Sequence, residues 1–200
     1  MVEDCCEKSK KGFYLRKLCH ITLGSLFILF FHFGIKYLEL KTTLFFAAII
    51  LLVEVIIEYI RVELHFWGKG DKIKHIVKKS ETESFSSVTS ALVIGIVLFS
   101  VFEKNIAFAA MTISIFGDVA AALIGKTFGK IKLCSRGKTF EGFLAYFITG
   151  LLVGSIFLPI YICIIISLIA AFAELNCSKI EDNFIIPLLI SFIAFLLQVF

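Results

Sequence analysis

The 200-residue sequence has few residues that interrupt helices and little that would separate one domain from another. It contains 2 prolines and 13 glycines, and neither a polar low-complexity tract nor an internal repeat is visible. This leaves no room for a separate soluble domain, so we expect one domain spanning 1–200. The 6 cysteines are scattered, without a C-x-x-C pair or the spacing of secreted proteins. They therefore indicate reduced thiols rather than a disulfide framework.

Apolar residues dominate what remains. Hydrophobic residues make up 59% of the chain, and the mean hydropathy is +0.96. Several apolar stretches approach the roughly 20 residues that cross a bilayer as a helix. Seven stretches lie at 18–37, 42–60, 85–102, 105–124, 142–157, 158–173 and 184–200. The sequence therefore predicts an all-α fold, a polytopic integral membrane bundle of about seven transmembrane helices. We expect the first stretch to be retained rather than removed as a signal peptide, because no small-residue cleavage site follows it.

The apolar run 142–173 needs to be divided. As one helix it would be about 48 Å long, too long for a hydrocarbon core of about 30 Å. Gly154, Ser155 and Pro159 provide a turn signal near its middle. The run is therefore predicted to form a tight hairpin of two short helices.

Basic residues are distributed unequally between alternate connections. The polar N-terminal segment 1–17 carries five, 61–79 six and 126–138 five, and Lys179 raises the total on that side to 17. The other side has only Lys36, Lys41 and Lys104. The positive-inside rule therefore predicts a cytoplasmic N-terminus and an outside C-terminus. The cytoplasmic side would hold the basic linker 62–80 and the basic loop 126–140. The linker could form a helix at the membrane interface, or it could simply provide the positive charge expected on that side.

The stretch "GDVAAALIGKTFGK", 117–130, combines small residues with charges at the cytoplasmic end of the fourth apolar stretch. Small residues recur every fourth position and form a stripe on which another helix can pack closely: Gly117, Ala121, Gly125 and Gly129. Asp118 and Lys126 share the neighbouring row but lie about 12 Å apart, too far for a direct ion pair. A polyanion with a divalent metal could join them. The alternative is an aspartate paired with another helix and lysines that reach lipid headgroups.

The next segment, "SRGKTFEG" at 135–142, returns charges to the same face after a short basic loop. It contributes Arg136, Lys138, Thr139 and Glu141, and Gly137 can free the backbone for close approach to a phosphate. Glu141 is also an ordinary choice for the first turn of a helix. Residue pattern alone thus indicates a polyanion site on the cytoplasmic face.

These segments resemble the membrane lipid kinases that use CTP, the family of dolichol, phytol and yeast-type diacylglycerol kinases. "GDVAAALIGKTFGK" with "RGKTFEG" carries the resemblance, together with two further stretches. "RKLCHITLG", 16–24, is similar to the family's R-K-x-x-H-x-x-x-G opening, and "AELNCSKIEDNFIIPLL", 173–189, to its E-(x)-D-D-N-x-x-x-P segment. In the second stretch Glu181 stands where the family usually has Asp, which retains an acid.

The resemblance implies transfer of the γ-phosphoryl group of CTP to the hydroxyl of a membrane lipid alcohol, with Mg²⁺ or another divalent cation. Asp118 and Asp182 are expected at the metal, and His20 and Glu174 as further catalytic candidates. The expected nucleotide-binding residues are Arg16, Lys17, Lys126, Arg136, Lys138, Thr139, Glu141 and Asn183. His20 could orient the lipid hydroxyl or simply bond a neighbouring helix. We assign no general base, because phosphoryl transfer depends mainly on positioning and charge neutralisation.

Two other functions remain open from the sequence. Phosphatidate cytidylyltransferases look similar around 117–142 and also use CTP, but this chain lacks their P-G-H-G-G and D-R-x-D elements. A small transporter would also carry intramembrane acids and histidines, although its site would lie near the bilayer midplane. We expect no nucleic-acid partner. Prenol chains and diacylglycerol both present a hydroxyl on an apolar body, so the sequence does not choose between them, and the oligomeric state is open.

Overall fold

All regular structure in the described chain is α-helical. The computed structural model describes residues 2–66, 87–133, 137–176 and 182–199. These residues contain six helices and no strand: α1 (Val2–Phe66), α2 (Ser87–Val101), α3 (Lys104–Phe128), α4 (Phe140–Gly154), α5 (Ile160–Asn176) and α6 (Asp182–Val199). The predicted all-α class is confirmed.

Helix α1 is two helices joined at a sharp bend. Glu39 has φ 68° and ψ 161°, far from helical values, and it separates an arm at 2–38 from an arm at 40–66. The Thr43 hydroxyl donates to the Glu39 carbonyl at 2.7 Å, which anchors the start of the second arm. Gly34 leaves room for Thr43 at this corner, since a Cβ on Gly34 would lie 2.6 Å from the Thr43 methyl group. Helical segments therefore occur at all seven predicted positions.

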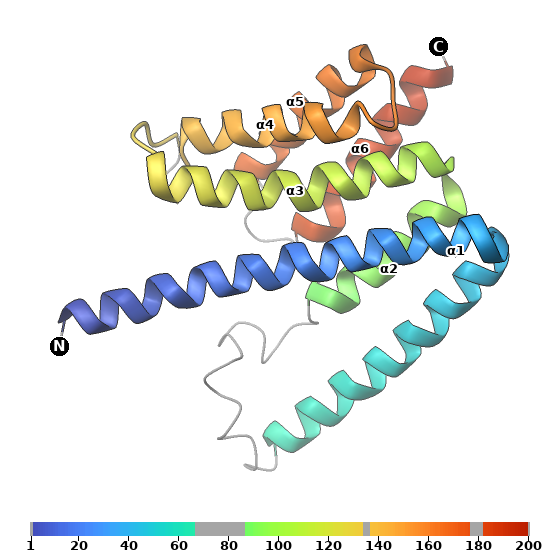
Figure 1. Ribbon diagram of the computed structural model, residues 1–200, viewed down its shortest axis with the longest axis horizontal. Coiled ribbons are helices and arrows are strands. Elements are labelled where there is room, and N and C mark those ends of the chain that lie inside the picture. The colour runs from blue at the N-terminus through green and yellow to red at the C-terminus, as the bar shows by residue number, and fades with distance from the viewer. Residues whose placement is uncertain (1, 67–86, 134–136, 177–181, 200) are drawn as a thin grey trace.

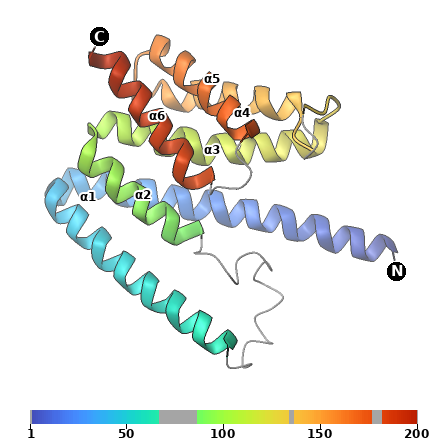
Figure 2. The ribbon, with the colours of Figure 1, turned by 180° about the vertical axis from the view of Figure 1, so that it is seen from behind.

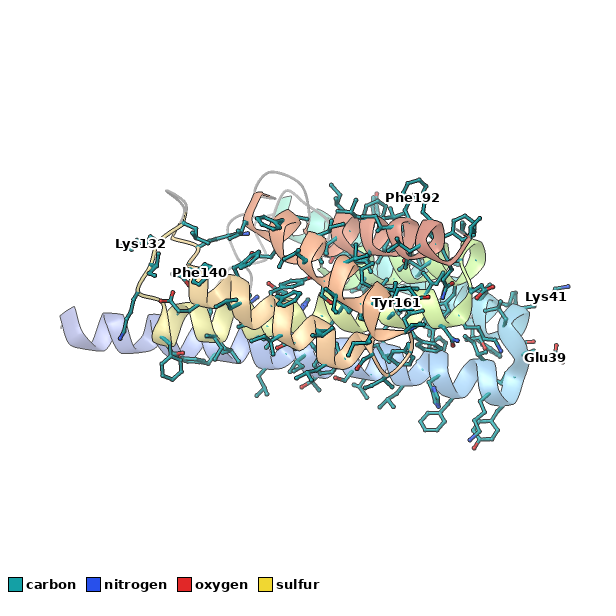
Figure 3. All side chains as sticks on the ribbon, turned by 90° about the horizontal axis from the view of Figure 1, so that it is seen from above. Glu39, Lys41, Lys132, Phe140, Tyr161 and Phe192 are labelled. Carbon is teal, nitrogen blue, oxygen red and sulfur yellow. The ribbon has the colours of Figure 1, made fainter. Side chains whose placement is uncertain are left out.

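The helical segments run back and forth between two ends of the molecule (Figure 1, and from behind in Figure 2). The N-terminus and the loop after α3 lie at one end, and the bend of α1 and the C-terminus lie at the other. Figure 3 shows this separation for single residues, with Lys132 and Phe140 far from Glu39 and Lys41. The described parts of the basic loop, 126–133 and 137–140, thus share one end of the bundle with the start of α1.

Helix α3 lies at the centre because it is apolar or small on nearly every face. Its residues from Ile106 to Ile115 are all buried. An aromatic stack ties it to its neighbours: Phe31 of α1 packs on Phe99 of α2 at 4.3 Å between ring centroids, and Phe99 contacts Phe108 of α3 at 4.8 Å. The core therefore fixes the relative positions of α1, α2 and α3.

The stripe of small residues on α3 is covered by α4, as predicted. A Cβ on Gly142 of α4 would lie 3.0 Å from the Ala121 carbonyl oxygen and 3.4 Å from the Gly125 Cα. A Cβ on Gly117 would meet the ring of Tyr146 at 2.8 Å. Close backbone approach is possible only because these positions lack side chains. The predicted hairpin after α4 is also present, with α4 ending at Gly154 and α5 beginning at Ile160.

Two helices of the described chain are long and apolar enough to cross a membrane. They cover Lys17–Ile60, which includes the bend at Glu39, and Lys104–Phe128. The other apolar helices are shorter, at 10–17 residues: Thr89–Val101, Phe140–Gly154, Ile160–Leu175 and Phe184–Val199. Seven spans and their orientation therefore stay predictions. The predicted basic linker 62–80 lies mostly outside the described residues, although α1 continues to Phe66.

Candidate functional site

A cleft of about 360 Å³ opens where the first arm of α1, the end of α3, the start of α4 and the end of α5 come together. Five charged side chains line it: Lys17, Asp118, Lys126, Lys138 and Glu174. All five were predicted from the sequence as site residues. They come from segments spread over more than 150 positions of the chain, so only the packing of the helices brings them together.

Asp118 pairs with a lysine of another helix. The Lys17 ammonium donates to Asp118 Oδ2 at 2.6 Å, and the two side chains are 22% and 27% exposed. Helix α1 can approach α3 this closely because Gly24 lacks a side chain; a Cβ there would lie 2.7 Å from Ile115. The interpretation in which Asp118 pairs with another helix thus describes this structure.

Lys126 lies against an aromatic residue. Its Nζ is 3.6 Å from the centroid of the Phe13 ring and 5.7 Å from that of Tyr14. Phe13 lines the cleft, whereas Tyr14 does not belong to its lining. Attraction of an ammonium group to a ring face at this distance is favourable by about 0.5–1 kcal/mol at an exposed site. The Lys126 ammonium group therefore lies against the Phe13 ring of α1 and not at Asp118.

Lys138 is presented by a small hairpin and bound by α5. The Leu133 N–H donates to the Lys138 carbonyl and the Phe140 N–H to the Ile131 carbonyl, each at 2.9 Å. Gly137, with φ +80°, supplies the left-handed conformation within this loop. The Lys138 ammonium donates to Glu174 Oε1 at 2.9 Å and also to the Glu174 backbone carbonyl. Glu174 thereby joins the loop to the end of α5.

Thr139 and Glu141 hold the loop and the start of α4 in place. The buried Thr139 hydroxyl accepts from the Gly142 N–H at 3.2 Å and caps α4. The Glu141 carboxylate accepts from the Ile131 N–H at 3.3 Å and is outside the cleft lining. The pKa of Glu141 is lowered, chiefly by a hydrogen bond from its own backbone N–H. Backbone hydrogen bonds from Lys130 and Ile131 and the charge of Lys130 lower it further, while desolvation opposes the shift. Both residues therefore shape the site in this structure.

His20 lies one turn beyond Lys17 and faces Asp118. Its Nε2 is 3.8 Å from Asp118 Oδ2, and this buried atom has no hydrogen-bond partner within the described chain. A cavity of about 20 Å³ adjoins it, lined among others by Ser114 and Pro187. That space is enough for about one water molecule. Pro187 belongs to the "EDNFIIP" stretch, so the first and last motif segments meet beside His20.

Four predicted site residues have side chains outside the described part: Arg16, Arg136, Asp182 and Asn183. Among the residues that are described, no group of three or more His, Cys, Asp or Glu side chains could hold a metal. Asp118 and Glu174 are the carboxylates that line the cleft. Mg²⁺ is usually held by one or two carboxylates together with substrate phosphates and water. The two cleft carboxylates match that number of protein ligands. The predicted metal pair of Asp118 and Asp182 stays a prediction.

Sequence reasoning missed Phe13 and the partner of Lys17. Phe13 precedes Lys17 by four residues, so both lie on one face of α1. That spacing could have drawn attention to the ring, since Lys17 was already a candidate. The identity of the Lys17 partner had no comparable signal, because Asp118 is 101 residues away.

Comparisons with known proteins agree with the motif evidence but are distant. No protein-family profile and no solved structure matches the chain. An uncharacterised protein of Methanocaldococcus jannaschii is 32% identical over 121 residues, covering 60% of this chain and 62% of that protein. The CTP-dependent diacylglycerol kinase 1 of Saccharomyces cerevisiae is 26% identical over 140 residues, which is 68% of this chain and 47% of the kinase. This chain is similar to a CTP-dependent lipid kinase. It spans less than two thirds of the length of both relatives.

Proposed function

We propose that the protein is a membrane lipid kinase that transfers the γ-phosphoryl group of CTP to the hydroxyl of a lipid alcohol. The observation that carries the proposal is the cleft in which three lysines and two carboxylates converge at the end of α3. A CTP-dependent diacylglycerol kinase aligns with 68% of this chain, and this match supports the choice of nucleotide and of substrate class. Dolichol, phytol and diacylglycerol all remain candidate acceptors.

The charges of the cleft suit a triphosphate. Lys17 and Lys138 are paired with carboxylates and Lys126 with a ring, so each ammonium has a weak, partly exposed partner that phosphate oxygens can replace. Three lysines against two carboxylates leave an excess of positive charge. Hydrogen bonds between ammonium groups and phosphate are charge-assisted and stronger than neutral ones. Nucleotide binding in the cleft would therefore exchange one set of partners for another without a large rearrangement.

Asp118 is the proposed metal-facing carboxylate. Once phosphate oxygens engage Lys17, the Asp118 carboxylate is available to Mg²⁺ or to water bound to it. A divalent cation would supply charge neutralisation at the β- and γ-phosphates. Asp182 is proposed as the second carboxylate at the metal, and Arg136 and Asn183 as further contacts to the nucleotide; the side chains of all three lie outside the described part of the chain.

In the reaction itself the bond between the γ-phosphorus and the β–γ bridging oxygen breaks, and a bond from the lipid oxygen to that phosphorus forms. The lipid hydroxyl releases its proton to solvent, and CDP leaves with the bridging oxygen and the electron pair of the broken bond. Lys17, Lys126 and Lys138 act by holding the phosphates and offsetting their charge. His20, whose Nε2 is buried beside Asp118, is the proposed contact for the lipid hydroxyl.

Labelled CTP tests this function in purified protein with lipid acceptors. We expect label from the γ position to appear in the lipid and label from the α position to stay in CDP. Dolichol, short prenols and diacylglycerol, tested in turn with otherwise identical micelles, identify the acceptor. Incorporation of the α label with release of pyrophosphate would instead show a cytidylyltransferase. Absence of both products with every acceptor, despite measured CTP binding, would leave the cleft as a nucleotide site without this chemistry.

A further inference from the structure

Phe13 is a prominent side chain of the cleft that the proposed chemistry does not use. Its ring lines the cleft, and the Lys126 ammonium lies 3.6 Å from the ring centroid. The neighbouring Tyr14 is 42% exposed, lies farther from Lys126 at 5.7 Å, and is absent from the cleft lining. The two adjacent aromatic residues therefore differ in whether a ligand in the cleft could touch them.

The cleft has an aromatic part next to a charged part. Phe13 and Lys17 are four residues apart on α1, so they lie on one face about 6 Å apart along the helix axis. Lys17 in turn contacts Asp118, where the phosphates are proposed to bind. A nucleoside triphosphate has the same division into a flat π-system and a polyanion.

We infer that Phe13 is the stacking surface for the base of the bound nucleotide, and that Lys126 covers the ring only until the nucleotide arrives. The inference rests on the proposed function, since it assumes a nucleotide in this cleft. An ammonium group is drawn to the electron-rich face of a ring. A base can replace it there by stacking, and the displaced Lys126 then reaches the phosphates.

Stacking is tolerant of base identity, because every base has a π-face. Phe13 therefore adds affinity for nucleoside triphosphates in general and does not select cytosine. Loss of the ring should weaken binding of CTP, UTP and ATP by similar factors. It should not weaken the binding of inorganic triphosphate, which has no base to stack and for which loss of the ring only releases Lys126.

Calorimetric titration of the full chain in detergent micelles tests the inference with two probes, CTP and inorganic triphosphate. Phe13→Leu keeps an apolar side chain and removes the ring; we expect CTP to bind roughly tenfold more weakly and triphosphate to bind no more weakly than to the unaltered protein. Phe13→Tyr, which keeps a ring, should bind CTP as the unaltered protein does. Tyr14→Leu is the matched control and should change neither affinity.

Fluorescence gives a second readout. Trp67 is the one tryptophan of the sequence. In the double variant Phe13→Trp, Trp67→Phe, CTP should quench the emission, whereas triphosphate should not.

The outcomes separate this inference from the function on which it rests. Equal weakening of CTP and triphosphate in Phe13→Leu, or no weakening of either, would overturn base stacking while leaving the triphosphate site intact. Failure of the unaltered protein to bind either probe would overturn both proposals together.

Discussion

Two of the three cleft lysines are held by carboxylates and the third by an aromatic ring. Lys17 pairs with Asp118, Lys138 with Glu174, and Lys126 with the ring of Phe13. Partly exposed ion pairs contribute little to stability, about 0–1 kcal/mol. At this site the two ion pairs, together with the contact between Lys126 and the ring, keep three positive charges in one cleft.

Removal of the Asp118 charge should abolish most activity while leaving the fold intact. Asp118→Asn retains size and hydrogen-bonding atoms but weakens the contact to Lys17 and to a metal. We expect turnover to fall about a hundredfold, which corresponds to about 3 kcal/mol of lost transition-state stabilisation. Turnover is measured in steady-state kinase assays with the lipid acceptor that the labelled-CTP experiment identifies.

Glu103 offers a matched control for that experiment. It precedes α3 at the opposite end from the cleft, is exposed, and makes no side-chain cap bond. Glu103→Gln should retain the activity of the unaltered protein. Near-normal turnover of Asp118→Asn would remove Asp118 from the site.

Glu141 should make stability depend on pH in acidic solution. Its folded-state pKa lies below the ordinary value of 4.5, because backbone N–H groups bind its charged form. A lowered pKa stabilises the fold above that ordinary value, and the contribution is lost as pH falls through the lowered pKa. The unaltered protein should therefore have a higher Tm than Glu141→Gln near neutral pH, and the difference should vanish in strong acid. A Tm difference that stays constant from neutral to acidic pH would contradict this role.

At the scale of helices, the seam between α3 and α4 determines whether the cleft exists. A Cβ atom on Gly142 would lie 3.0 Å from the Ala121 carbonyl oxygen. Both residues line the cleft. The stripe of small residues thus serves to bring Thr139 and Lys138 beside the charged end of α3. Without this close approach Lys138 and Thr139 would stand away from the charged end of α3.

Gly142→Val should separate the two helices. The added methyl groups cannot fit against the α3 backbone, and overpacking of this kind costs about 1–3 kcal/mol. We expect a lower Tm in thermal unfolding and weaker nucleotide binding. Leu144→Val, at an exposed position of the same helix, is the control and should change neither measurement appreciably.

For the whole molecule, the alternating course of the helices places the start of α1 and the described residues after α3 at one end. Lys132 lies at the end with the cleft and Lys41 at the opposite end, and both are exposed (Figure 3). With 17 of the 20 basic residues expected on the cleft side, that side is predicted to be cytoplasmic.

Cysteine labelling tests the orientation in a background without the 6 native cysteines. A cysteine at Lys132 should react with an impermeant reagent only from the cytoplasmic side, and one at Lys41 only from outside. The reverse pattern would invert the topology. Reaction of both from the same side would show that the two ends do not lie across a membrane.

The positions of the helices could be predicted from the sequence because they depend on local properties. Apolar runs, the turn at Gly154 and Pro159, and the small residues every fourth position of α3 act within one segment or on its immediate neighbour. The five charged residues of the cleft could also be named, since each belongs to a motif that is continuous in the chain. The break between the first two apolar stretches was expected between 37 and 42, and the bend lies in that interval, at Glu39.

The partners of those residues were decided by tertiary structure. Lys17 finds Asp118 across 101 positions, and Lys138 finds Glu174 across 36. Such pairs depend on how closely two helices approach and on how each is rotated about its axis. Both are set by the glycines at 24 and 142 together with the aromatic stack of the core. A motif names a charged residue, but helix packing determines which opposite charge, or which ring, that residue meets.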